Sequence, residues 1–308
     1  MGALGNFLVI SRAKVQTVSF ASATLGIFLG ADSFNEVLSW DVLVYVLLFY
    51  TLITFACNIN CFFDVNVDKL RKRELAAATL HFGKTRMGVI LFSEALMAIL
   101  LSLFLLFYGH WEVALLSLLG LYFGWAYSSP PLRIKGKGAI GPLPIVLGVY
   151  VLPIVAGYLL VDKVLTFTFL GFVAGYAIMN LGINLVNTCE DFSEDRKLGI
   201  RTIAHTLGLR STLDLAFFST LLGGALAMLC LLGRGYDIII ISFPGSSLAI
   251  LFFATSVMTV FMTSKEILVV GQAHDLERSA KKHAIKMPKW FVITRYPMWL
   301  FALTLLFL

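Results

Sequence analysis

One pattern of asparagine and aspartate residues occurs twice in the sequence. Each copy has the form Asn-x-x-x-Asp-x-x-x-Asp, and the residues are Asn60, Asp64 and Asp68 in the first motif and Asn187, Asp191 and Asp195 in the second. A step of four residues advances an α-helix by about 400°, so the three side chains of one motif share a helix face. Two carboxylates and an amide on one face suit a hard divalent cation such as Mg²⁺. We therefore predict that the two motifs hold a pair of Mg²⁺ ions.

Basic side chains follow both motifs. The candidates for binding an anion are Lys69, Arg71 and Lys72 after the first motif and Arg196, Lys197 and Arg201 after the second. Arginine fits phosphate oxygens with paired hydrogen bonds, and protein-bound Mg²⁺ is commonly shared between carboxylates and substrate phosphates. Together these residues predict a metal–diphosphate site. Any single one of the cations is equally well explained as a determinant of membrane topology.

The composition is that of a membrane protein. Of the 308 residues, 59% are hydrophobic and only 14% are charged, with a mean hydropathy of +0.88. A soluble domain is normally about 45–50% apolar and about 25% charged. We therefore expect one all-α polytopic membrane domain over residues 1–308. The net charge of +6 does not indicate nucleic-acid binding, because the basic residues fall in short loops between apolar segments.

Nine segments are apolar enough to span a membrane, which requires about 20 largely apolar residues. They lie at about residues 14–31, 41–62, 87–109, 111–128, 139–160, 165–188, 211–232, 237–263 and 290–308. Pro244 and Gly245 predict a kink in the eighth span. The nine helices are expected to form a bundle around a central cavity.

Lysine and arginine residues fall almost entirely on one side of this nine-span arrangement. With the residues up to Arg295 assigned to the loop before the last span, 22 of the 24 Lys and Arg residues lie on that side. The positive-inside rule makes this side cytoplasmic. The prediction is an integral protein of the cell membrane with its N-terminus inside, its C-terminus outside, and both Asp motifs at the cytoplasmic ends of their spans.

The spacing of the motifs indicates an internal repeat of four spans. The pseudo-repeats cover about residues 12–136 and 137–263, and the last helix, at 290–308, has no counterpart. Because four is even, the two copies have the same orientation, and both motifs can face one cavity. The loops after the second and sixth spans are each about 20 residues long and continue similarly. We expect a short helix in each, so that the two loops form a cytoplasmic cap.

Aromatic residues are abundant, with 26 Phe, 10 Tyr and 5 Trp. Aromatic faces stabilise cations, and a channel between apolar helices would hold a hydrocarbon chain. A metal-bound diphosphate at the cytoplasmic mouth and an apolar channel in the membrane fit a prenyl diphosphate donor. The other expected partners are a lipophilic acceptor and membrane lipid.

The sequence resembles the UbiA-type intramembrane prenyltransferases. The resemblance covers essentially the whole chain: nine spans, an Asp motif after the second and sixth, and between them the segment Tyr127-Ser-Ser-Pro130-Pro131-Leu-Arg133-Ile-Lys135. The paired motifs at this topology are specific, whereas either motif alone is weak. Three positions depart from the family pattern, which often has Asp directly after the first Asn and Arg-Pro after the first motif and before span one. Here those positions hold Cys61, Glu74 and Ala13.

The resemblance implies a mechanism and a set of roles. The residues expected to hold Mg²⁺ across the diphosphate are Asp64, Asp68, Asp191 and Asp195, helped by Asn60 and Asn187. The bond between C1 and the diphosphate oxygen then breaks toward an allylic carbocation, and the acceptor attacks C1. Tyr127 and Lys135 are expected to be catalytic residues beside the diphosphate or the acceptor. The departures at the three positions leave the residues that bind the acceptor undefined.

Two other functions could use paired acidic motifs in a membrane protein. A CDP-alcohol-type phosphotransferase also uses Asp motifs and metal, but its D-G-x-x-A-R signature does not occur in this sequence. A transporter for a divalent cation or an anion could use the repeat for alternating access. Transporter sites lie near the midplane of the membrane, whereas the acidic residues here lie at helix ends, with Glu94 as the one acid well inside a span.

Overall fold

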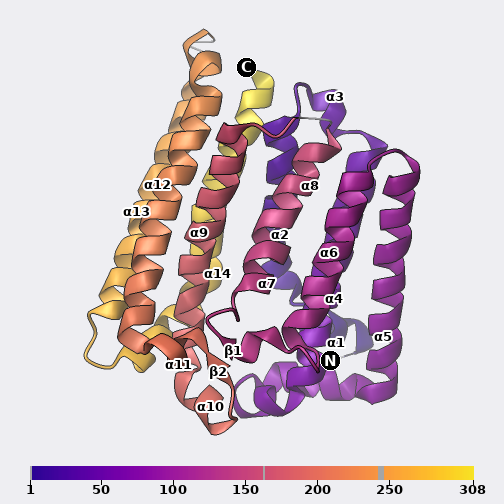
Figure 1. The fold of residues 1–308 in the computed structure, drawn as a ribbon, viewed down its shortest axis with the longest axis vertical. Helices are drawn as coiled ribbons and strands as arrows, with labels where there is room; N and C mark the ends of the chain where they lie inside the picture. The colour runs from indigo at the N-terminus through magenta and orange to yellow at the C-terminus, as the bar shows by residue number, and fades with distance from the viewer. Residues whose placement is uncertain (1, 162–163, 242–245) are drawn as a thin grey trace.

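The computed structural model describes residues 2–161, 164–241 and 246–308. The chain forms a bundle of long helices lying side by side, with the N-terminus at one end of the bundle and the C-terminus at the other (Figure 1). The helices are α1 (Ala3–Ile10), α2 (Ala13–Gly30), α3 (Phe34–Val37), α4 (Trp40–Arg71), α5 (Arg73–Phe107), α6 (Trp111–Ser128), η1 (Ile134–Gly136), α7 (Leu143–Ile145), η2 (Val146–Val151), α8 (Leu152–Leu160), α9 (Phe167–Glu190), α10 (Phe192–Lys197), α11 (Ile203–Leu207), α12 (Leu209–Ile241), α13 (Ser247–Gly271), α14 (Leu276–Thr304) and η3 (Leu305–Phe307).

Seven helices within the described residues are long and apolar enough to cross a membrane. They are Trp40–Leu70, Arg73–Phe107, Leu143–Leu160, Phe167–Glu190, Leu209–Gly235, Ser247–Gly271 and Pro288–Phe307. Each overlaps a predicted span, so the prediction of an all-helical polytopic membrane protein is confirmed. The two remaining predicted spans correspond to α2, with an apolar stretch at Phe20–Gly30, and to the 18-residue α6.

The boundary between the seventh and eighth spans was predicted wrongly. The apolar residues 238–241 belong to the end of α12 and not to the start of the next span, because α12 continues to Ile241 and α13 begins at Ser247. The kink predicted at Pro244 and Gly245 lies outside the described residues.

Arg295 was counted among the loop charges although it falls within the predicted last span, and that count is wrong for it. It lies inside the membrane-spanning part of α14, Pro288–Phe307, and is 2% exposed. The charge made residue 295 look like part of the preceding loop, but the helix carries it into the core. It therefore cannot be counted among the loop charges that set topology.

The two Asp motifs have different backbones. The first lies within the unbroken 32-residue α4, so its three side chains share a helix face as predicted. The second does not: α9 ends at Glu190, Asp191 has φ −99° and ψ 9°, and α10 begins at Phe192. The prediction of one helix face is wrong for the second motif, and Asp195 belongs to a separate short helix.

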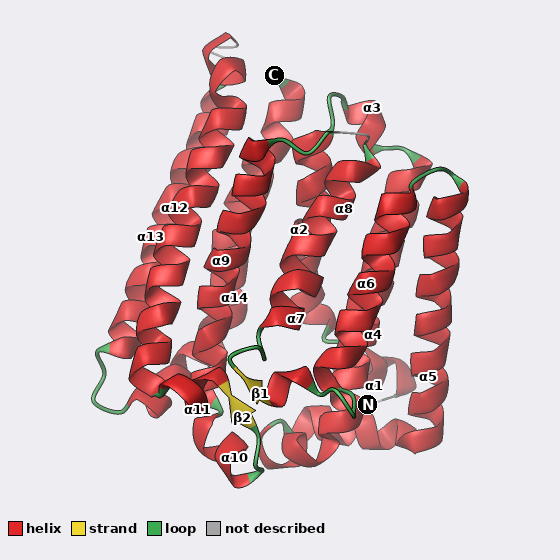
Figure 2. Cartoon of the chain, in the orientation of Figure 1, coloured by secondary structure: helices red, strands yellow, loops and turns green. Residues whose placement is uncertain are grey.

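Short helices lie in both loops that were expected to contain them. In α5 the backbone breaks at Gly83, where φ is 68°, a conformation that favours glycine. In the second loop, α10 and α11 follow one another. Strands β1 (Lys137–Gly138) and β2 (Arg201–Thr202) pair in parallel and join this loop to the one after α6 (Figure 2).

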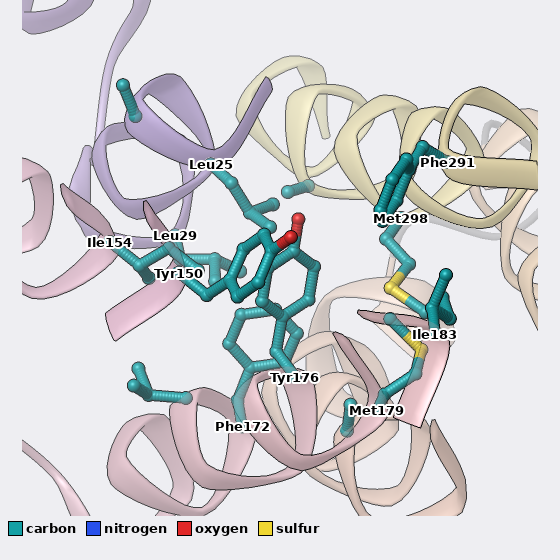
Figure 3. Close-up of a cluster of buried hydrophobic side chains, with 14 of the residues drawn as sticks. Leu25, Leu29, Tyr150, Ile154, Phe172, Tyr176, Met179, Ile183, Phe291 and Met298 are labelled. Carbon is teal, nitrogen blue, oxygen red and sulfur yellow. The ribbon is translucent and has the colours of Figure 1, made fainter. Parts of the chain in front are cut away.

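Close packing of helix backbones holds the bundle together. A Cβ atom at Gly182 of α9 would lie 2.5 Å from the carbonyl oxygen of Ala216 in α12, so only glycine permits this contact. Between α2, α9 and α14 the core is filled by large buried side chains, including Tyr176, Met179 and Met298 (Figure 3). This packing fixes α9, which leads to the second motif.

Candidate functional site

Both Asp motifs lie at the same end of the bundle, together with β1, β2, α10 and α11 (Figure 1). In the first motif, Asp64 and Asp68 are 7% and 6% exposed. Carboxylates are rarely buried to this extent unless they are paired or bind a metal. The partners of the two carboxylates therefore determine what the site can bind.

Asp64 is the centre of an ionic network. The Lys135 ammonium forms an ion pair with Oδ2 of Asp64, and Nη2 of Arg133 lies 3.2 Å from Oδ1. Nδ2 of Asn60 donates to the same carboxylate at 2.8 Å. Lys135 and Arg133 come from the turn after α6, where Arg133 has a φ of 38° before η1. The turn thus brings two cations against the first motif.

Asn60 links the motif to two further elements. Nη2 of Arg12 donates to Oδ1 of Asn60 at 2.9 Å, and Nδ2 of Asn60 donates to Oγ of Ser128 at 2.9 Å. Arg12 stands between α1 and α2 with a φ of 51°. Arg12 was counted as a topology charge, and neither Arg133 nor Ser128 was predicted to belong to the site. Ser128 directly follows Tyr127, and Arg133 lies two residues before Lys135. Their place in the Tyr127–Lys135 segment was the sequence signal that could have identified them.

Tyr127 lies near the end of α6, directly before Ser128, which accepts a hydrogen bond from Asn60 of the first motif. The paired strands bring the turn with Lys135 beside the loop that follows α10, because Lys137 pairs with Arg201. Residues far apart in the sequence thus converge on one place at this end of the bundle.

The second motif is held by contacts between α10 and α14. We call these residues the α10 clasp: Ser193 and Glu194 of α10, and Glu277 and Lys281 of α14. The backbone N–H and the hydroxyl of Ser193 donate to Glu277 at 3.3 and 2.5 Å. Lys281 donates to Glu194 at 3.0 Å and to Glu277 at 2.8 Å. Burial acts to raise the pKa of Glu277, but the hydrogen bonds from Lys281 and Ser193 outweigh it and hold the pKa below the ordinary value.

Replacing Glu277 with glutamine is expected to destabilise the protein by about 1 kcal/mol at pH 7, because the clasp is partly exposed. A lowered carboxylate pKa contributes stability that is present above the ordinary value of about 4.3 and is lost as the pH falls through the folded-state pKa. The difference in Tm between Glu277→Gln and the parent should therefore shrink below pH 4. Thermal unfolding across pH tests this, with the exposed Glu74→Gln as control; a difference that does not vary with pH would contradict it.

The predicted diphosphate-binding cations lie around the mouth of the site. Lys69, Lys72, Arg196, Lys197 and Arg201 are exposed, and the side chain of Arg71 lies outside the described part of the structure. Lys72 acts electrostatically on Asp68. Burial lowers the pKa of the Lys135 ammonium, although Asp64 acts in the opposite direction. Lys135 is thus part of the buried network around Asp64.

The donor atoms fit Mg²⁺. Oδ2 of Asp68 is buried and has no hydrogen-bond partner among the described residues, so it is an available hard oxygen ligand. Asn187 is half-buried near the end of α9, as is Asp191 at the helix break. Within the described residues, no three acidic, His or Cys side chains are grouped closely enough to hold a metal by themselves. An ion here would therefore complete its shell with ligand oxygens or water, as Mg²⁺ commonly does.

Comparison with known proteins gives a consistent result. A model of the UbiA prenyltransferase family matches residues 19–285. The chain is 30% identical over 263 residues to the digeranylgeranylglyceryl phosphate synthase of Korarchaeum cryptofilum, covering 83% of this chain and 87% of that protein. It is 27% identical over 212 residues to the lycopene elongase/hydratase of Haloarcula japonica, covering 68% and 69%. A UbiA homologue from Archaeoglobus fulgidus, solved with DMAPP and Mg²⁺, superposes with a TM-score of 0.71 at 13% identity, covering 98% of this chain and 99% of that one.

Proposed function

This chain belongs to the UbiA prenyltransferase family, and we propose that it moves a prenyl group from a polyprenyl diphosphate to a lipophilic acceptor within the membrane, using two Mg²⁺ ions. The enzyme is a prenyltransferase of this family. Membership of the family supports neither of the alternatives, a phosphotransferase or a transporter. Homologues of this fold have been solved with DMAPP and Mg²⁺ and with GPP and Mg²⁺. The proposal extends that binding to this chain.

The observation that carries the proposal is that both motifs lie at the same end of the bundle, where the turn after α6 contacts each side. Lys135 of this turn pairs with Asp64 of the first motif, and Lys137 pairs with Arg201 in the loop after the second. We propose that the metal ligands are Asn60, Asp64, Asp68, Asn187, Asp191 and Asp195. The mouth cations Lys69, Arg71, Lys72, Arg196, Lys197 and Arg201 would attract the anionic donor to the site.

Each residue at the site has a separate task. Bound Mg²⁺ supplies Lewis-acid stabilisation of the negative charge that builds on the departing diphosphate. Lys135, held by Asp64, donates hydrogen bonds to diphosphate oxygens, and Tyr127 donates from its hydroxyl. The bond between C1 and oxygen breaks with both electrons leaving on the diphosphate. A nucleophilic atom of the acceptor then forms a bond to C1 and loses a proton.

An apolar pocket begins at Tyr127 and suits the prenyl chain. Apart from Tyr127, its walls are apolar side chains and glycines of α4, α6, α7 and η2, including Leu52, Gly120, Gly124 and Gly148. Ligand pockets lined mainly by apolar side chains, with a few placed polar groups, favour apolar ligands. We propose that C1 of the donor lies at Tyr127 and that the hydrocarbon extends from it into this pocket.

Replacing Gly120 with leucine should shorten the donors that the enzyme accepts. A Cβ atom at Gly120 would lie 3.7 Å from Cδ1 of Leu52, an ordinary contact, so the larger side chain fills pocket space without forcing the helices apart. We expect kcat/KM for geranylgeranyl diphosphate to fall at least tenfold and that for dimethylallyl diphosphate to stay within about twofold, since each buried CH₂ contributes about 0.8 kcal/mol. Gly88→Leu, on the open face of α5, is the control. An equal effect on both donors would mean that the hydrocarbon of the donor does not occupy this pocket.

We also propose that α2 and α6 complete nine spans, that the pseudo-repeats cover about 12–136 and 137–263, and that the motif end faces the cytoplasm. The opposite positions of the termini (Figure 1) support an odd number of spans. Cysteines placed at Lys137 and His274, both exposed, should react with a membrane-impermeant maleimide only from the cytoplasmic side. The parent would carry alanine at the partly exposed Cys57 and Cys230. Labelling of either position from outside intact cells would reject this topology.

The proposed reaction is tested with purified protein in lipid nanodiscs. Radiolabelled geranyl and geranylgeranyl diphosphate are supplied with a panel of lipophilic acceptors, with and without Mg²⁺. We expect diphosphate release and a prenylated product that both require the metal. If no donor and acceptor pair gives Mg²⁺-dependent release of diphosphate, the proposed reaction is wrong.

A further inference from the structure

Arg295 is a buried cation that the proposed reaction does not use. It lies within the membrane-spanning part of α14 and is 2% exposed. An arginine at the centre of a membrane helix costs about 2.5–3.5 kcal/mol on insertion scales, and such residues usually mark a functional site. The partners of Arg295 indicate what that function is.

The partners of the guanidinium are neutral. Nε donates to Oδ1 of Asn180 at 2.8 Å, and Nη2 donates to the same oxygen. The guanidinium carbon lies 4.7 Å from the centre of the Tyr150 ring and 4.2 Å from that of Phe291. Among the described residues, no carboxylate forms an ion pair with Arg295. An amide oxygen and two aromatic faces stabilise a cation, but they leave its full charge uncompensated.

Other polar side chains converge on the same place. Nδ2 of Asn184 donates to the Tyr150 hydroxyl at 2.7 Å, which leaves the hydroxyl proton of Tyr150 available to another acceptor. The Tyr176 hydroxyl lies 3.2 Å from Oγ of Ser22. In Figure 3 the hydroxyls of Tyr150 and Tyr176 point toward the same region between α2, α9 and α14. We call this set the inner polar cluster: Ser22, Tyr150, Tyr176, Asn180, Asn184 and Arg295.

The inner polar cluster lies directly inward of the diphosphate site. Asn184 precedes Asp191 by seven residues along the chain, which is about 10 Å at 1.5 Å per helical residue, and Asn180 is one turn further in. Tyr150 also acts electrostatically on Tyr127. A molecule the size of one aromatic ring, with a polar group on the cluster, would present its other end close to Tyr127.

We propose that the inner polar cluster binds an anionic oxygen group of the acceptor, a carboxylate or a phosphate, with Arg295 and the Tyr150 hydroxyl as donors. This rests on the proposed function and narrows the acceptor class, because a pure hydrocarbon would leave the buried charge uncompensated. Hydrogen bonds to a charged group of this kind change affinity by about 10- to 100-fold. An anionic acceptor should therefore depend strongly on Arg295, and a neutral one should not.

The test measures probe binding to the full protein in nanodiscs with Mg²⁺, both without donor and with the non-transferable geranyl S-thiolodiphosphate. Two anionic probes, 4-hydroxybenzoate and geranylgeranylglyceryl phosphate, are paired with the neutral 4-hydroxybenzamide and geranylgeranylglycerol. We expect at least one anionic probe to bind more tightly than its neutral partner. Arg295→Met should weaken that probe at least tenfold, Arg295→Lys less, and Tyr150→Phe by several-fold. The affinity of these variants for the donor analogue should stay unchanged. The probe pair that shows the effect identifies the bound group as a carboxylate or a phosphate.

The controls separate binding from structure. Arg278→Met changes an exposed arginine at the start of α14, and Tyr158→Phe changes a buried tyrosine two turns after Tyr150; both should bind all probes like the parent. If Arg295→Met does not fold, the near-isosteric Tyr150→Phe decides. The proposal is overturned if neither anionic probe binds better than its neutral partner. It is also overturned if Arg295→Met and Tyr150→Phe lower only Tm and leave the preference for the anionic probe intact. If the parent protein does not bind the donor analogue, the result would instead count against the proposed function.

Discussion

Replacing Asp64 or Asp191 with asparagine is expected to reduce prenyl transfer about 100- to 1,000-fold, while the protein still expresses and folds. An amide keeps the shape of the side chain but removes the charge that would hold Mg²⁺ and that, at Asp64, also pairs with Lys135. Losing one preorganised charged contact costs about 100- to 1,000-fold in kcat. Asp64 lies in α4 and Asp191 at the break between α9 and α10, so equal losses would show that the motifs act together. Single-turnover rates with radiolabelled donor measure the effect.

The control for this pair is Asp214→Asn, which changes a half-exposed aspartate on α12. It should leave turnover within about twofold, as is usual for surface changes. Asp64→Asn is expected to lower Tm modestly, because Lys135 and Arg133 lose their counter-charge. Near-normal turnover in both motif variants would remove the two-motif mechanism.

Replacing Lys135 with methionine is expected to lower kcat about 100-fold. Lys135 is the predicted cation that contacts a motif carboxylate inside the buried network, so it is placed to stabilise the charge on the leaving diphosphate. Metal binding should persist, because the carboxylates remain. The measurement is kcat together with the Mg²⁺ concentration for half-maximal rate, which should change little.

Lys137 provides a matched control for Lys135, since it is exposed two residues further along the same turn. Lys137→Met should behave like the parent, and Lys135→Arg should restore part of the rate because the charge returns. If Lys137→Met were as damaging as Lys135→Met, the effect would come from the local charge of the loop and not from the contact with Asp64.

Periodicity predicted the parts of the site that depend on one helix. The spacing of Asn60, Asp64 and Asp68 placed them on one face of α4, and the apolar segments located seven helices that are long enough to cross a membrane. These features follow from local sequence because helical geometry alone determines which side chains lie together.

The features that were missed depend on contacts between distant segments. No Pro or Gly lies beside Asp191, so the sequence gives no signal for the break in the helix there. The short helix after the break is held by Glu277, which is 84 residues later in the sequence than its partner Ser193. Arg12 and Arg133 reach the first motif through left-handed turns, which no periodic pattern describes. Arg295 was read as a loop charge because a buried arginine is rare, and only the packing of α9 against α14 reveals its place.

The central claim, that both motifs form one Mg²⁺–diphosphate site, is tested most directly by binding of geranyl S-thiolodiphosphate. The dissociation constant is measured with and without Mg²⁺ for the parent, Asp64→Asn, Asp191→Asn and the double variant. The account predicts that each single variant loses nearly all of the Mg²⁺-dependent affinity and that the double variant loses little more. Full Mg²⁺-dependent affinity in either single variant would contradict it, because that motif would then not belong to the site.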